Sequence, residues 1–91
     1  MTDRKKVITV LYFAAASTAT GITEEEIDIA DEGVSLASLG EILVARHPET
    51  GLDEVLAGSQ WSVDASMVDD PASVMLKGGE EVAVICPVSG G

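Results

Sequence analysis

The last two residues of the chain, Gly90 and Gly91, have the clearest potential for chemistry, and they follow the mainly apolar run 82–88. Glycine has no Cβ and tolerates any backbone angle, so a glycine pair fits a narrow channel in a partner enzyme. The reactive group of such an end is the α-carboxylate of Gly91. The pattern predicts a carboxylate that another protein activates. The alternative is a frayed end without a role, because terminal residues are often disordered.

Pro87 predicts how this end leaves the domain. Proline has no backbone N–H, so it cannot continue a central strand, and we expect it to start an extended tail over residues 88–91. Four residues at about 3.3 Å each reach roughly 13 Å, far enough to enter a neighbouring pocket. We expect Val88 to anchor the root of the tail in an apolar groove of a partner, with Pro87 and Ser89 in the same binding stretch.

The composition describes an acidic chain of 91 residues, which is enough for a single domain over 1–91. The chain has sixteen acidic and five basic residues, for a net charge of −11. Such a surface repels phosphate backbones and favours a protein partner with a basic docking face. One cysteine and one histidine give no disulfide and no metal cluster built on those residue types, so no metal and no cofactor are expected on this chain.

The N-terminus has a feature that resembles a secretory signal, because the basic residues 4–6 precede the apolar run 7–16. Removing that run would delete the most strand-like segment of a small domain. We therefore expect it to stay and the protein to be cytoplasmic. No segment approaches the length that spans a membrane.

Four stretches have the patterns of strands. Residues 7–13 are rich in β-branched and aromatic side chains, and residues 82–86 are apolar, so both are expected to be buried. In the second half of the stretch 22–30, apolar and acidic residues alternate, which places Ile27 and Ile29 on one face of a strand. Residues 61–68 also alternate, with Trp61 and Met67 on one side and Ser62 on the other, which predicts one strand with one wet face.

Helical spacing appears in the middle of the chain. Ser35 is a plausible N-cap, and apolar residues recur at Leu36, Leu39, Ile42 and Leu43. Pro48 should end this helix near Arg46 or His47, whose positive charge would favour the helix C-terminus. The stretch 14–21 is predicted as a loop, 52–56 as a short helical turn, and 31–33, 69–71 and 77–81 as turns.

The order strand, strand, helix, strand, strand predicts an α+β fold. The first and last strands are the most apolar, so they should lie side by side and parallel at the sheet centre. A mixed sheet of four to five strands with one main helix packed on one face is the β-grasp, or ubiquitin-like, fold.

Other candidate sites have simpler explanations. Consecutive strand residues point to opposite faces, so the acidic run 24–26 is expected to be a solvated face and not a metal site. The pair 78–79 is expected to be a turn, because no Gly-Lys-Ser/Thr pattern and no helix follow it. Cys86 is expected to be a small buried hydrophobe.

Taken together, three parts of the chain resemble the small, sulfur-carrying subunit of molybdopterin synthase. They are the stretch 10–14 (Val-Leu-Tyr-Phe-Ala), Gly21, and the ending 79–91, where a Gly-acidic-acidic turn and an apolar strand lead into Pro-Val-Ser-Gly-Gly. Cys86 stands where members commonly have a second proline, a departure that concerns the end of the strand and not the chemistry.

The resemblance implies a carrier, not a catalyst. A partner that resembles ubiquitin-activating enzymes would adenylate Gly91 with Mg-ATP and, as a sulfurtransferase, convert it to a thiocarboxylate. The tail, with Gly90 giving access, would then enter the large subunit and give its sulfur to cyclic pyranopterin monophosphate. Catalytic side chains would belong to the large subunit, in a heterotetramer of two small and two large subunits.

Three other functions remain open at this point. The first is a sulfur carrier for thiamine thiazole synthesis or tRNA thiolation. The second is a ubiquitin-like modifier that is joined to target lysines. The third is a plain binding module in which the tail has no role.

Overall fold

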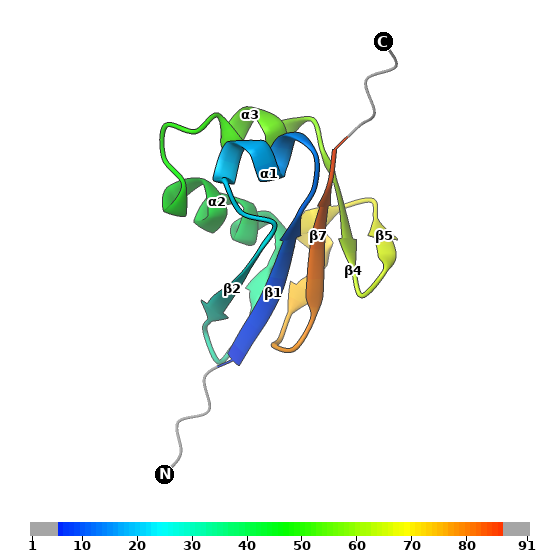
Figure 1. Ribbon diagram of the computed structural model, residues 1–91. Helices are drawn as coiled ribbons and strands as arrows, with labels where there is room; N and C mark the ends of the chain where they lie inside the picture. The colour runs from blue at the N-terminus through cyan, green and yellow to red at the C-terminus, as the bar shows by residue number, and fades with distance from the viewer. Residues whose placement is uncertain (1–5, 87–91) are drawn as a thin grey trace.

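Strands from the two ends of the described chain lie together at the centre of one sheet (Figure 1). The computed structural model describes residues 6–86. Its strands are β1 (Lys6–Tyr12), β2 (Glu24–Ile29), β3 (Val34–Ser35), β4 (Gln60–Val63), β5 (Ser66–Val68), β6 (Met75–Leu76) and β7 (Glu81–Ile85). Its helices are α1 (Ala15–Thr20), α2 (Leu36–Arg46), α3 (Leu52–Ala57) and the 3-10 turn η1 (Pro71–Ser73).

The main sheet has the predicted mixed arrangement, with strand order β2-β1-β7-β4-β5. β1 and β7 pair in parallel, with Val10 beside Val82 and Tyr12 beside Val84. β2 and β4 run antiparallel to these two neighbours. The predicted parallel pairing of the first and last strands is therefore confirmed.

Helix α2 covers one face of this sheet, as expected from its apolar spacing. Its side chains at Leu36, Leu39 and Leu43 are fully buried in the core. The predicted N-cap is confirmed, because the hydroxyl of Ser35 accepts a hydrogen bond from the N–H of Ser38 at 3.1 Å. The helix ends at Arg46, with His47 as its C-cap and Pro48 as the next residue, as predicted.

The stretch 14–21 was predicted as a loop, and this is wrong, because residues 15–20 form helix α1. Small side chains carry little periodicity, yet Ala16 is fully buried in the core and α1 packs against α3. The left-handed Gly21 ends the helix, and its N–H donates to the carbonyl of Ser17. Figure 1 shows α1 and α3 together at the end of the sheet where β7 finishes.

The single strand predicted over 61–68 is also wrong, because the chain reverses there into the hairpin β4–β5. Asp64 and Ala65 both have positive φ, 51° and 71°, as a type I′ turn requires. The turn places Trp61 in the core, while Met67 lies on the opposite face and is 56% exposed. Ser62, predicted on the wet side, is only 8% exposed.

Glu25 connects β2 to the end of α2. Its carboxylate accepts hydrogen bonds from the Tyr12 hydroxyl at 2.7 Å and from Arg46 Nε at 3.0 Å. His47 Nε2 lies 2.7 Å from the same carboxylate. Of the acidic run 24–26, expected to be a solvated face, only Glu24 and Glu26 are exposed; Glu25 shares the core face with Ile27.

This cluster shifts two pKa values. Burial raises the pKa of the Tyr12 phenol, and its hydrogen bond to Glu25 raises it further. Burial also raises the pKa of Glu25, but hydrogen bonds from His47, Tyr12 and Arg46 outweigh it and hold that pKa below the ordinary 4.5. A carboxyl group whose pKa is lowered by folding stabilises the fold above its unfolded pKa and loses that contribution as the pH falls.

We predict that Glu25→Gln lowers the free energy of unfolding by about 2 kcal/mol at pH 7, because three donors lose a charged acceptor. Urea unfolding at a series of pH values measures this difference. It should narrow below pH 4.5, the ordinary pKa of the group, as wild-type Glu25 becomes protonated. Glu26→Gln, an exposed neighbour, is the control and should change little; a Glu25→Gln effect that is the same at pH 7 and pH 3 contradicts the assignment.

A second prediction concerns Ala14, which precedes α1 with φ 52° and ψ −123°. Glycine enters this region freely, whereas an L-residue there is strained by about 1–3 kcal/mol. After the added freedom of the unfolded chain is subtracted, Ala14→Gly should raise the free energy of unfolding by about 1 kcal/mol. Ala19→Gly, inside α1, should lower it by a similar amount. A loss of stability in Ala14→Gly would refute the strain.

Candidate functional site

All five residues predicted to carry the chemistry, Pro87, Val88, Ser89, Gly90 and Gly91, lie outside the described residues, so their predicted roles stay predictions. The structure does show what they are attached to. β7 lies between β1 and β4 and is hydrogen-bonded to both. Val82 and Val84 are fully buried on its core face. Residue 87 therefore follows a strand that is paired on both sides.

The turn before β7 is fixed by Glu80. Its carboxylate accepts hydrogen bonds from the N–H groups of Lys77 at 2.9 Å and Gly78 at 2.7 Å. Partial burial raises the pKa of Glu80, but these backbone donors outweigh it and hold the pKa below 4.5. Asp64 adds a second connection, because its carboxylate accepts from the N–H of Glu81 at 3.0 Å. The predicted turn over 77–81 is confirmed, and its carboxylates set the register with which β7 enters the sheet.

The end of β7 is held by Cys86, the last described residue. Its thiol donates to the carbonyl of Phe13 at 3.3 Å, and its sulfur lies 3.6 Å from the Ser59 hydroxyl. That hydroxyl donates a 2.6 Å hydrogen bond to the carbonyl of Val55. Cys86 is only partly buried, so the expectation of a small buried hydrophobe holds only in part; the thiol connects β7 to the end of β1 and to α3.

We call the face of the sheet away from α2 the open sheet face. It carries a band of side chains that is apolar at its centre. One row of cross-strand neighbours runs across all five strands and consists of Glu24, Leu11, Ala83, Ser62 and Met67. Neighbours in a row share a face, so these side chains lie side by side. The next position towards the end of β7, Ile85, lies on the same face.

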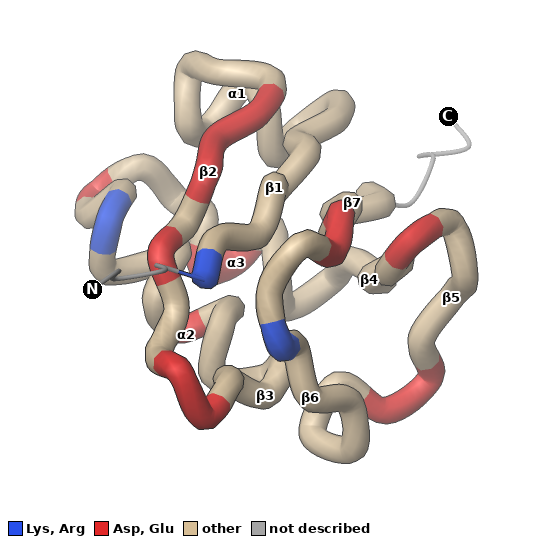
Figure 2. The backbone as a smooth tube through the Cα atoms, turned by 90° about the horizontal axis from the view of Figure 1, so that it is seen from below, with Lys and Arg blue, Asp and Glu red and all other residues tan. Residues whose placement is uncertain are grey.

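Carboxylates lie at the β2 edge of this band and at the start of β7. Glu24, Glu26 and Glu81 alternate onto the open sheet face from these two strands. Figure 2 shows acidic segments along β2, near β4 and near β5, with Lys or Arg at few positions of the described chain. An apolar strip with an acidic border fits a protein surface that is apolar at its centre and basic at its rim.

Phe13 extends the apolar surface at the same end of the sheet. It directly follows β1, is 48% exposed, and its carbonyl accepts from the Cys86 thiol. Large exposed apolar side chains grouped in this way mark interaction surfaces. The structure thus places Trp61 in the core, Phe13 at the surface and Leu11 part-exposed on the open sheet face.

Among residues 6–86 no group of acidic, histidine or cysteine side chains is arranged to hold a metal ion. Within the same range, none of the helices is both long enough and apolar enough to cross a membrane. The described part ends just after β7, a strand hydrogen-bonded on both sides, and residues 87–91 follow it in the sequence.

Comparison with known proteins agrees with this arrangement. The ThiS family matches residues 10–91. A molybdopterin synthase sulfur carrier subunit from Mycosarcoma maydis is 38% identical over 93 aligned positions, which cover 100% of this chain and 100% of that protein. Subunit 1 of a molybdopterin converting factor from Pyrococcus furiosus has 30% identity and a TM-score of 0.75, covering 91% of this chain and 99% of that chain.

SAMP1 from Haloferax volcanii shows the fold alone, with a TM-score of 0.78 at 18% identity over 93% of this chain and 99% of that chain. The expected β-grasp fold is thus confirmed by topology and by solved structures. On the match over residues 10–91 and the end-to-end identity with its fungal relative, the chain belongs to the ThiS family and is a homologue of molybdopterin synthase sulfur carrier subunits.

Proposed function

We propose that this chain is the sulfur carrier subunit of molybdopterin synthase and carries sulfur as a thiocarboxylate on Gly91. The end-to-end match with a sulfur carrier subunit of that synthase is the observation that carries the proposal. The geometry supports it, because β7 is the central strand and leads directly into residues 87–91. A carrier that must deliver its end into another active site needs such a fixed point of departure.

The chemistry follows from the poor reactivity of a carboxylate. The Gly91 carboxylate attacks the α-phosphorus of ATP, pyrophosphate leaves, and an acyl adenylate forms. A sulfur nucleophile supplied by a donor then displaces AMP and leaves the thiocarboxylate. Mg-ATP is held by the activating partner, an adenylyltransferase and sulfurtransferase similar to ubiquitin-activating enzymes, and no cofactor by this chain. Gly90 and Gly91 fit the narrow channels of both partners because they have no side chains.

The second half of the cycle takes place in the large subunit. The thiocarboxylate sulfur forms a C–S bond to cyclic pyranopterin monophosphate as a C–O bond at that carbon breaks and the oxygen group leaves. Water then hydrolyses the thioester that links the two, which leaves the sulfur on the pterin and restores the Gly91 carboxylate. Two such transfers supply the two sulfurs of the dithiolene. The catalytic side chains belong to the large subunit, and this chain contributes the sulfur and its position.

The open sheet face is the docking surface for the large subunit in this proposal. Leu11, Met67 and Ile85 supply the apolar centre, and the carboxylates at the β2 edge and at the start of β7 select a basic rim and speed association at low salt. The face lies beside the strand that carries the tail, so docking and tail insertion are geometrically coupled. Two small and two large subunits form the complex, and the cytoplasm is its location.

Two rivals use the same tail. A sulfur carrier for thiamine thiazole or tRNA thiolation differs in its large partner, and the identity with a molybdopterin synthase subunit favours the proposed one. A ubiquitin-like modifier shares the fold, as SAMP1 does, so the fold does not separate the two functions. Covalent conjugates to target lysines in cell extract would favour the modifier.

The first prediction of this proposal is a mass change at Gly91. Incubation with ATP, an activating enzyme and a sulfur donor should replace one oxygen by sulfur, which intact-protein mass spectrometry detects and fragmentation maps to the last residue. Gly91→Ala, or one residue added after Gly91, should abolish loading, because a Cβ or a longer chain crowds the adenylation site.

Circular dichroism of both variants should match the wild type, which shows that the loss of loading is not unfolding. Gly58→Ala serves as a matched control for a glycine-to-alanine change, since a Cβ there meets no atom within 4 Å, its φ of −101° suits alanine, and the sequence of residues 87–91 is unchanged. Normal loading of the Gly91 variants would overturn the proposal.

The second prediction tests the docking face with two methionines of similar exposure. Met67 on the open sheet face is 56% exposed, and Met75 on β6 is 50% exposed. Met67→Lys should weaken binding to the large subunit at least tenfold, a loss of about 1.4 kcal/mol, because it places a desolvated charge at the apolar centre. Met75→Lys should bind as the wild type does. Isothermal titration calorimetry measures both, and equal effects would place the interface elsewhere.

A further inference from the structure

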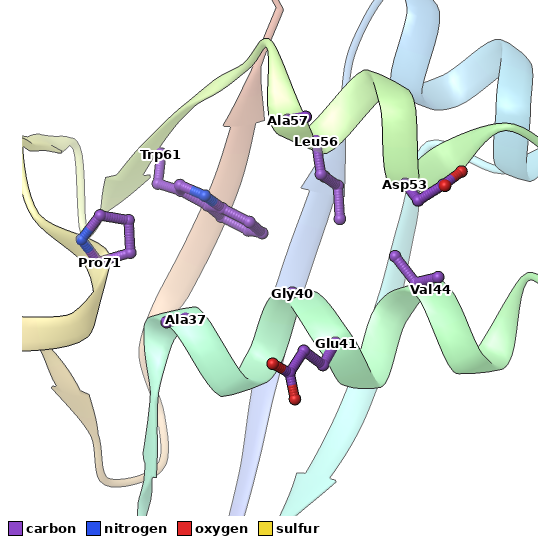
Figure 3. Close-up of a pocket in the computed structure, with 9 residues that line it drawn as sticks. All are labelled: Ala37, Gly40, Glu41, Val44, Asp53, Leu56, Ala57, Trp61 and Pro71. Atoms are coloured by element: carbon purple, nitrogen blue, oxygen red, sulfur yellow. The ribbon is translucent and has the colours of Figure 1, made fainter.

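An apolar groove lies on the helix side of the molecule, opposite the open sheet face, between α2 and α3 (Figure 3). Its volume is about 420 Å³. The side chains of Trp61 and Leu56 project into it from β4 and α3, with Val44 across from them on α2. Its remaining lining comes from Ala37, Gly40, Glu41, Asp53, Ala57 and Pro71. We call it the helix groove.

Gly40 forms the floor of this groove and is not required by the backbone. It lies inside α2, where glycine destabilises a helix by comparison with alanine. A Cβ at Gly40 would meet the Trp61 ring at 3.5 Å and Leu56 at 4.0 Å, which are ordinary contact distances. Folding alone would therefore accept alanine. The glycine leaves a space of about one methyl group beside the Trp61 ring at the base of the groove, and alanine would occupy it.

The charged side chains that line the helix groove are all negative. Glu41 on α2 and Asp53 on α3 are both exposed, and the described lining contains no basic side chain. The ion pairs found among residues 6–86 involve neither carboxylate. A ligand for this groove therefore has an apolar body and positive charge on both flanks.

We propose that the helix groove binds an amphipathic basic segment of a protein partner, with an apolar side chain over Gly40 and lysine or arginine facing Glu41 and Asp53. Such a segment uses the helix-in-groove mode of recognition. A second copy of this chain fits poorly, because its net charge of −11 opposes an acidic groove. The inference does not rest on the proposed function, because the groove lies on the helix side and the open sheet face is on the other.

Trp61 is only 7% exposed, so its emission is already that of a buried indole, and binding is read instead from the fluorescence anisotropy of a dye-labelled peptide. The probes are two synthetic helical peptides with the same leucine pattern, one with lysine and one with glutamate at the polar positions. The anisotropy of the lysine peptide should rise to saturation as the protein is added. The anisotropy of the glutamate peptide should not change.

Charge reversal tests whether Glu41 and Asp53 attract the peptide. The double variant Glu41→Lys and Asp53→Lys should weaken the lysine peptide more than tenfold and gain binding of the glutamate peptide. The double variant Glu24→Lys and Glu26→Lys makes the same change of net charge on the open sheet face, and should keep most of the affinity. If the two double variants lose the same affinity for the lysine peptide, the attraction is to the overall charge of the protein, and the proposal that the helix groove binds the peptide is wrong.

Gly40→Ala separates binding from stability. The melting temperature should rise by about 4 °C or more, because alanine favours the helix. Affinity for the lysine peptide should nevertheless fall several-fold, since the methyl group fills the floor. A variant that binds equally well would overturn the role of Gly40. Sedimentation velocity that shows a dimer of this chain, dissociated by the lysine peptide, would instead show that a second copy occupies the groove, which also overturns the proposal.

Discussion

The parallel pairing of β1 with β7 is the constraint on which the rest of the structure depends. Two parallel neighbours cannot be joined by a tight turn, so the whole of the intervening chain must cross from one end of the sheet to the other. That crossover contains α2, which buries Leu36, Leu39 and Leu43 against the face that β1 and β7 share. The pairing also sets the direction of β7, which ends beside α1 and α3, and so decides where the last residues of the chain begin.

The fixed position of β7 gives the two faces of the sheet different uses. On the core face, Val82 and Val84 are fully buried and hold the strand in register. On the open sheet face, the alternate positions Ala83 and Ile85 join Leu11 and Met67 in a band that α2 leaves uncovered. The strand that residues 87–91 follow is thus also a strand of the open sheet face. In the proposed function, a partner bound to this face is therefore next to the strand from which the tail begins.

Much of this arrangement could be predicted from the sequence because the apolar signals of the central elements are strong. Residues 7–13 and 82–86 are β-branched runs, and the helix beginning after Ser35 has both a cap and a clear spacing. Helix α1 was missed because alanine, serine and threonine show no amphipathic pattern, and only the packing of Ala16 reveals it.

The hairpin at Asp64 and Ala65 was missed for a different reason. Its turn uses positive φ at two residues other than glycine, so no turn signal marked it, and every side chain after it was assigned to the wrong face. Met67 was consequently expected beside Trp61, whereas it belongs to the open sheet face. The tail residues 87–91 were predicted from residue type alone and lie outside the described residues. Glu25 had a readable signal, since it alternates with Ile27 onto the core face, but charge was taken to mean exposure.

Two positions break local rules in opposite ways, and the difference separates structure from function. Ala14 occupies a backbone conformation suited to glycine, and Gly40 occupies a helix interior suited to alanine. Ala14 lies where β1 ends and α1 begins, next to the carbonyl that accepts from Cys86, so its strain belongs to the tight connection that holds the end of β7. Gly40 has no such connection to explain it. Its neighbours leave room for a methyl group, so packing of the described residues does not demand glycine, and what glycine adds is a methyl-sized space beside the Trp61 ring at the base of the groove. Departures from local preference that tertiary structure does not require are where a binding surface is expected.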